Sequence, residues 1–68
     1  MSTVILDNLS RNARTSDVEE FFHGFGRIRD INIKSDHAII CFDDQRDAED
    51  AVRRLDGRRL CEERVHVT

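Results

Sequence analysis

The chain has 68 residues, of which 38% are hydrophobic and 37% charged, and its formal net charge is -3. This length allows one small domain, and the composition excludes a disordered tail. No apolar run reaches the roughly 18 residues of a transmembrane helix, and no signal segment opens the chain. We therefore expect a single intracellular domain over residues 1–68, with its core over roughly 3–68.

The first quarter of the chain predicts a strand followed by a helix. Residues 3–10, TVILDNLS, form the short β-branched and aliphatic run of a strand. Four apolar residues then follow the i, i+3, i+4, i+7 spacing of one helix face: Val18, Phe21, Phe22 and Phe25. We expect the helix to begin at a capping box of Ser16 and Glu19, or with Thr15 as its N-cap, and to end before Gly26.

A hairpin is predicted in the middle of the chain. Residues 27–34, RIRDINIK, alternate apolar and polar side chains at Ile31 and Ile33, and residues 37–42, HAIICF, form a third apolar run. The segment between these two strands leaves little room for a loop. A tight turn is therefore expected at residues 34–37.

The last third predicts a second helix and a final strand. Either Asp43 or Asp44 can cap this helix, and Gly57 ends it. Its buried stripe is expected to comprise Ala48, Ala51, Val52 and Leu55. The final strand is expected over residues 64–68, with both of its valines facing the core.

The element order is therefore β-α-β-β-α-β, which defines the fold class as α+β. We expect a ferredoxin-like sandwich, a four-stranded antiparallel sheet with two helices on one face. The other face of the sheet is then open, and a binding function would lie there.

Two segments resemble the signature motifs of the RNA recognition motif family. VILDNL at residues 4–9 resembles the six-residue motif on the first strand, and SDHAIICF at residues 35–42 aligns with the eight-residue motif on the third. Three longer blocks, EFFHGFGRIRDINIK, FDDQRDAEDAV and LDGRRLCEERV, are similar to the first such domain of serine/arginine-rich (SR) splicing factors. The resemblance implies a nuclear module of an SR-type splicing factor that binds single-stranded pre-mRNA.

The sequence departs from the family pattern at the positions that usually contact bases. The family places stacking aromatics where this chain has Ile5, His37 and Ile39. In the eight-residue motif, Ser35 and Asp36 replace a basic residue and a glycine. Base stacking on an aromatic is worth about 1–3 kcal/mol per base, so we expect weak RNA binding, in the micromolar to tens-of-micromolar range.

The resemblance and the strand alternation together define a candidate RNA platform on the open face. It comprises Ile5, Asn32, Lys34, His37, Ile39, Arg64 and His66. The residues at the three aromatic positions are expected to contact bases, and the two cations to contact phosphates. The remaining two, Asn32 and His66, are expected to hydrogen-bond base edges. The charges predicted on this face, two aspartates against Lys34 and Arg64, sum to zero.

The missing aromatics also favour an alternative function. Ile5, Ile39 and Cys41 would form an exposed apolar patch, which is typical of an interaction surface. The alternative is a protein-interaction module, self-associating in one version, that has kept the fold and reduced or lost its affinity for RNA.

Catalysis is not expected. The sequence has no nucleophile–base pairing, metal-ligand spacing or glycine-rich phosphate loop, so we expect no enzyme, no metal site and no cofactor. The separation of Cys41 and Cys61 matches no metal site, and we expect two free thiols.

Overall fold

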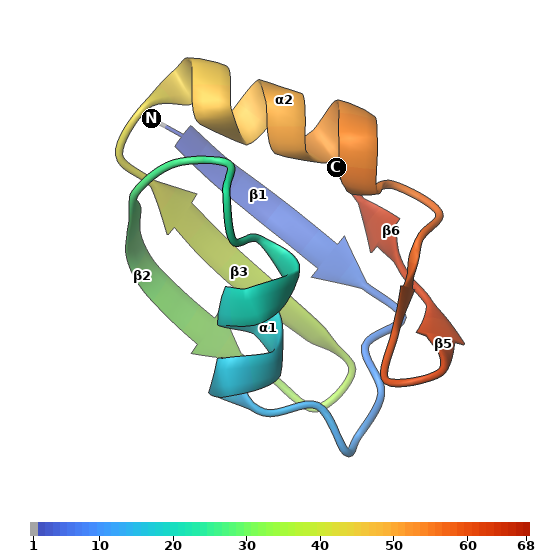
Figure 1. The fold of residues 1–68 in the computed structure, drawn as a ribbon. Coiled ribbons are helices and arrows are strands. Elements are labelled where there is room, and N and C mark those ends of the chain that lie inside the picture. Colours follow the sequence, from blue (N-terminus) through green and yellow to red (C-terminus); the bar gives the residue numbers. More distant parts are fainter. Residues whose placement is uncertain (1) are drawn as a thin grey trace.

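The computed structural model describes residues 2–68 as an antiparallel sheet that carries two helices on one face (Figure 1). The strands of this sheet are β1 (Ser2–Asp7), β2 (Ile28–Ile33), β3 (His37–Phe42) and β6 (His66–Val67). The helices are α1 (Thr15–Phe21) and α2 (Gln45–Leu55), and a separate hairpin consists of β4 (Arg59–Leu60) and β5 (Glu63–Arg64). The spatial order β2-β3-β1-β6 confirms the predicted ferredoxin-like α+β plan. Neither helix within residues 2–68 is long and apolar enough to cross a membrane.

The two central strands pair over their full lengths. β1 and β3 are antiparallel, with Ser2 opposite Phe42 at one end and Asp7 opposite His37 at the other. Successive side chains of a strand point to opposite faces, so alternate residues enter the core. These are Val4, Leu6, Ala38, Ile40 and Phe42, all of them buried. The assignment of β1 and β3 residues to the two faces is therefore confirmed.

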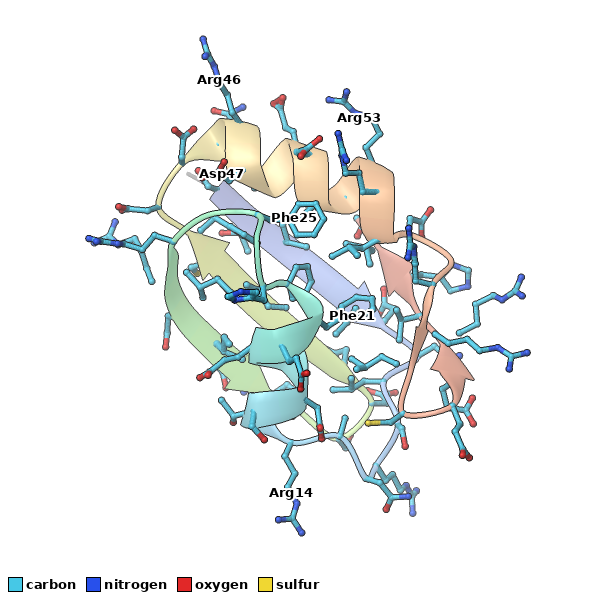
Figure 2. All side chains as sticks on the ribbon, viewed as in Figure 1. Arg14, Phe21, Phe25, Arg46, Asp47 and Arg53 are labelled. Atoms are coloured by element: carbon cyan, nitrogen blue, oxygen red, sulfur yellow. The ribbon has the colours of Figure 1, made fainter. Side chains whose placement is uncertain are left out.

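The helices close the core from one side. α1 contributes Val18 to the core, and Phe22 is the first residue after the helix. Both side chains are fully buried. The Phe22 ring meets Phe21 and Phe42 edge to face, with centroid distances of 5.3 and 5.7 Å. In Figure 2 the labelled Phe21 and Phe25 lie on the helix side of the sheet, and both are half-buried. The phenylalanines of the predicted stripe thus belong to the core or its margin.

The start of α1 differs from both predicted caps. The N-cap residue is Arg14, and its backbone N–H donates to the Asp17 carboxylate at 2.9 Å. Asp17 is the third helical residue, where an acidic side chain can reach back to the cap and also meets the positive end of the helix dipole. The predicted capping box at Ser16 and Glu19 is therefore wrong, as is Thr15 as N-cap, because Thr15 is already helical.

α1 also ends earlier than predicted, at Phe21 rather than just before Gly26. Gly24 and Gly26 have φ angles of +91° and +122°, so the chain leaves the helix through a glycine-dependent turn. Phe25 therefore reaches the core margin from this turn and not from the helix. Helical spacing alone cannot distinguish the two cases.

The middle hairpin and the second helix agree with the sequence, except that Val52 of the predicted buried stripe is half-buried. Three residues separate β2 from β3, and the Lys34 N–H donates to the His37 carbonyl at 2.8 Å. Of the two candidate caps for α2, Asp44 is the N-cap, and its carboxylate accepts the Arg46 N–H at 2.8 Å. The helix ends at Leu55, and Gly57 follows with a φ angle of +84°.

The predicted final strand is broken into two. Residues 63–64 pair with β4, and only residues 66–67 join the main sheet. Val65 between them is fully buried, and its N–H donates to the Arg58 carbonyl at 2.9 Å. The inward direction of both valines is confirmed, since Val67 is 1% exposed. The β4–β5 hairpin was not predicted.

Both cysteines are free and half-buried. Cys41 lies on β3 and Cys61 in the turn between β4 and β5. Burial, assisted by the nearby Asp17 carboxylate, raises the pKa of the Cys61 thiol. This favours the protonated thiol over the reactive thiolate.

The Gly26 turn yields a stability prediction. A Cβ at Gly26 would collide with the Asp47 carboxylate and would lie 2.9 Å from Asp47 Cβ, a contact that rotation of the Asp47 side chain does not relieve. A Cβ at Gly24 meets nothing within 4 Å. We expect Gly26→Ala to lower the free energy of unfolding by about 1–3 kcal/mol more than Gly24→Ala, measured by chemical denaturation. Equal losses of unfolding free energy in the two variants would show that α2 can shift at Asp47 without cost.

Candidate nucleic-acid interface

The open face of the sheet is organised in rows that cross the strands, and its middle row is the most apolar. Ile5 and Ile39 lie directly opposite each other on the two central strands, and both are half-buried. Asn32 is paired with Ile39 on the β2 side. Thr68 is paired with Ile5 on the other side through two backbone hydrogen bonds of 2.9 Å. An aliphatic pair therefore occupies the centre of the face, with a polar residue at each end.

A second row, which we call the histidine row, consists of His37, Asp7 and His66. Asp7 is paired with His37 on β3 and with His66 on β6. Residues that face each other in an antiparallel sheet have Cβ atoms about 4.5–5.5 Å apart, so the carboxylate stands between two imidazoles. The row combines two hydrogen-bonding rings with one acceptor, which is suitable for contacts with base edges.

Each histidine of this row also has a carboxylate partner outside the strands. His37 Nδ1 lies 2.9 Å from Asp36 Oδ1, and the imidazole donates this hydrogen bond. His66 Nδ1 lies 3.9 Å from Asp56 Oδ1, an oxygen that also accepts the Val67 N–H at 3.0 Å. The hydrogen bond from His37 holds the pKa of the Asp36 carboxyl below its usual range.

A third row, near the start of β1, consists of Asp30, Cys41 and Thr3. Cys41 is paired with both of the others, and its Sγ lies 4.0 Å from Thr3 Oγ1. The β2 register shifts between Ile28 and Asp30, which marks a bulge. The bulge places the successive residues 29 and 30 both in exposed positions.

The structure gathers five of the seven predicted platform residues on this one face: Ile5, Asn32, His37, Ile39 and His66. Lys34 follows directly after β2, at one edge of the sheet. Arg64 belongs to β5 and not to the sheet, and its carbonyl accepts the Asn8 side-chain N–H at 2.7 Å. The two cations thus stand at opposite edges, beyond the ends of the histidine row.

The charge around the face is more acidic than the sequence predicts. Asp7 and Asp30 are exposed on the strands, as expected. Asp36 and Asp56 add two carboxylates through their contacts with the histidines, so four acids accompany two cations. Sequence reasoning missed both partners. Adjacency to His37 could have indicated Asp36, but only the fold brings Asp56 to His66.

Within residues 2–68, no group of three or more His, Cys, Asp or Glu side chains is placed to hold a metal ion. Ile5 and Ile39 on this face offer apolar contact, and its histidine row offers hydrogen bonds. A sheet with both helices on one side and aligned, partly exposed side chains on the other defines the class of open-faced split βαβ modules. Residues 4–66 match the family model of the RNA recognition motif, and the chain belongs to that family. This family is RNA-binding and non-enzymatic, so the chain is not an enzyme.

The chain is also similar to curated splicing factors. It is 52% identical to serine/arginine-rich splicing factor 5 of Homo sapiens over 64 residues. The aligned segment covers 94% of this chain and 24% of that protein. It is 48% identical over 67 residues to human serine/arginine-rich splicing factor 4, or 98% of this chain and 14% of that protein. The chain thus spans a quarter or less of the length of these two relatives.

A solved structure shows the same fold. The structure of the Nab3-RRM, described as giving insight into cis element recognition of non-polyadenylated RNAs, superposes with a TM-score of 0.91 at 25% sequence identity. The superposition covers 98% of this chain and 91% of that one.

The Asp36–His37 contact yields a pH prediction. A carboxyl whose pKa is lowered on folding stabilises the folded state at pH values above the usual pKa. This contribution is lost as the pH falls through the lowered pKa. We expect His37→Gln to raise the pKa of Asp36 toward its usual value, measured by a carboxyl-carbon NMR titration. His66→Gln is the matched control and leaves Asp36 unchanged. Identical Asp36 titrations in wild type and His37→Gln would assign the shift to another cause.

Proposed function

We propose that this chain is a nuclear, single-stranded RNA-binding module of an SR-type pre-mRNA splicing factor, and that it binds weakly through the open face of its sheet. Membership of the RNA recognition motif family and similarity to SR splicing factors support this proposal. The observation that carries it is the register of the two central strands. This register leaves Ile5, His37 and Ile39 together on the uncovered face.

The middle row supplies the surface for the bases. Ile5 and Ile39 offer an apolar contact about two side chains wide, on which the face of a base loses water without aromatic overlap. The His37 ring lies in the adjacent row, and its side chain is 37% exposed, so it remains available for stacking. One imidazole and two aliphatic side chains therefore take the place of the family's usual aromatic set.

Polar groups around this surface supply orientation. Asn32 and His66 lie at opposite ends of their rows, and both are exposed. They are suited to hydrogen bonds with base edges, whereas Lys34 and Arg64 at the sheet edges are suited to phosphates. Few cations and several carboxylates accompany this surface, so the electrostatic contribution to affinity is small. Weak binding follows from this charge pattern together with the missing rings.

A second candidate function is protein interaction through the same face, with self-association as one form. The partial exposure of Ile5, Ile39 and Cys41 favours it, because clustered apolar side chains are typical of interaction surfaces. The two functions use the same residues but differ in salt dependence. Binding to RNA weakens with salt through counterion release, whereas apolar association does not.

An amide chemical-shift titration with a pool of short single-stranded RNAs, at about 50 and 200 mM salt, separates the two functions. We expect RNA to shift the amides of Ile5, His37, Ile39 and His66, and salt to reduce these shifts. If RNA leaves them unchanged while they broaden with protein concentration, the sheet is an interface between copies of the chain.

Restoring an aromatic at the platform tests the same proposal by a gain of affinity. Ile39→Phe places a ring at the centre of the middle row, and stacking of one base adds about 1–3 kcal/mol, or roughly 5- to 150-fold in Kd. Ile39→Leu is the matched control, because it keeps the apolar volume without a ring. Fluorescence anisotropy with a labelled RNA measures both. Equal RNA affinity of the two variants would show that the bases do not contact residue 39.

A further inference from the structure

The β4–β5 hairpin places two arginines directly opposite each other. Arg59 is paired with Arg64, and both side chains are exposed. Leu60, the next residue of β4, packs against the core. Because side chains alternate along a strand, the arginine pair lies on the face of the hairpin that points away from the core. Like charges in this position destabilise a hairpin.

No carboxylate neutralises this pair in the described part of the chain. The arginine ion pairs within 4.0 Å there are Arg29–Asp43 and Arg54–Asp50, on β2 and α2. Glu63 is next to Arg64 in sequence, but it is paired with Leu60 and so belongs to the opposite face of the hairpin. Two arginines without an ion pair inside residues 2–68 therefore occupy directly opposed positions of the hairpin.

The hairpin is held in place beside the end of β1, next to the edge of the sheet that β6 forms. Its turn residues, Cys61 and Glu62, have φ angles of +51° and +68°, as in a tight two-residue hairpin turn. The Asn8 side chain donates to the Arg64 carbonyl at 2.7 Å, which ties β5 to the end of β1. Figure 1 shows β5 beside that end of β1, below β6. The arginine pair thus stands next to the end of the histidine row.

We propose that Arg59 and Arg64 form a clamp for one phosphodiester group of the RNA strand. The guanidinium group presents a planar set of donors that matches two phosphate oxygens, and an anion between two such groups removes their mutual repulsion. The sequence predicts phosphate contacts for Lys34 and Arg64, and the cross-strand register adds Arg59 beside Arg64. This inference rests on the proposed function.

The position of the clamp favours RNA over a phosphorylated protein. Lys34 follows β2 at the opposite edge of the sheet, so that β3, β1 and β6 lie between it and the hairpin. Asp7, in the middle of the histidine row, repels phosphate there. Phosphate groups are thereby confined to the two edges, while bases lie over the strands between them.

The salt dependence of RNA binding tests the clamp. Each phosphate contact of a single strand contributes about 0.7 to the slope of log K against log salt. We expect Arg59→Gln to reduce this slope by about that amount and to weaken binding roughly tenfold at low salt, equally for all RNA sequences in the pool. Removal of the like-charge pair leaves the thermal midpoint unchanged or higher, so loss of folding does not explain the result.

Arg53→Gln is the matched control. Arg53 is exposed on α2 and points outward from the helix layer in Figure 2. The Arg53→Gln substitution changes the net charge by the same amount as Arg59→Gln, and we expect it to leave the slope of log K against log salt unchanged. If wild-type protein binds RNA and Arg59→Gln behaves like Arg53→Gln, the clamp is wrong and the proposed function stands.

The opposite failure is also distinguishable. If wild-type protein binds no RNA in the pool, the proposed function and the RNA clamp both fall. A chemical-shift titration with a phosphoserine peptide then tests whether Arg59 and Arg64 bind phosphate on a protein partner. Chemical-shift changes at Arg59 and Arg64 would indicate that the pair binds a phosphorylated protein partner. The absence of such changes would show that the pair has no phosphate ligand.

Discussion

The pairing of β1 with β3 is the constraint on which the rest of the structure depends. Six residues of each strand face each other without a bulge, and every second side chain enters the core. A slip of β1 by one residue would move Leu6 to water and bring Ile5 under the helices, and a slip of β3 would exchange Ile40 and Ile39 in the same way. The same register therefore decides which residues hold the domain together and which are left for a ligand. Stability and binding cannot be varied independently on these two strands.

The open face separates its interactions by position. Its centre is aliphatic and nearly uncharged, its histidine row alternates rings with a carboxylate, and its cations stand at the edges. A ligand that covers this face gains mostly by loss of water from the centre and by directional hydrogen bonds around it. Long-range attraction contributes little, because the carboxylates offset the cations. Such a surface selects its ligand at close contact and does little to attract it from a distance.

The sequence predicted the parts of the fold that carry local signals. The aspartate cap of the second helix, predicted at Asp43 or Asp44, the short middle hairpin and the face of each central strand follow from residue type and period. The structure confirms the hairpin and the faces, and it selects Asp44 as the cap. The bounds of α1 were wrong because Asp17 reaches back to Arg14, and because Phe25 keeps helical spacing while lying in a turn. The β4–β5 hairpin was missed because its left-handed turn uses cysteine and glutamate instead of glycine or asparagine. The contact of His66 with Asp56 depends on tertiary structure, and no sequence pattern indicates it.

The bulge in β2 bears on how the protein stays dispersed in a crowded cell. β2 is one outer strand of the sheet, and an outer strand exposes unpaired backbone groups on which another chain can add a strand. The irregularity between Ile28 and Asp30 breaks the straight template, and two charged side chains stand beside it. The other outer strand, β6, is only two residues long. Both borders of the sheet are thus poor seeds for fibril growth, although the open face itself carries half-buried isoleucines.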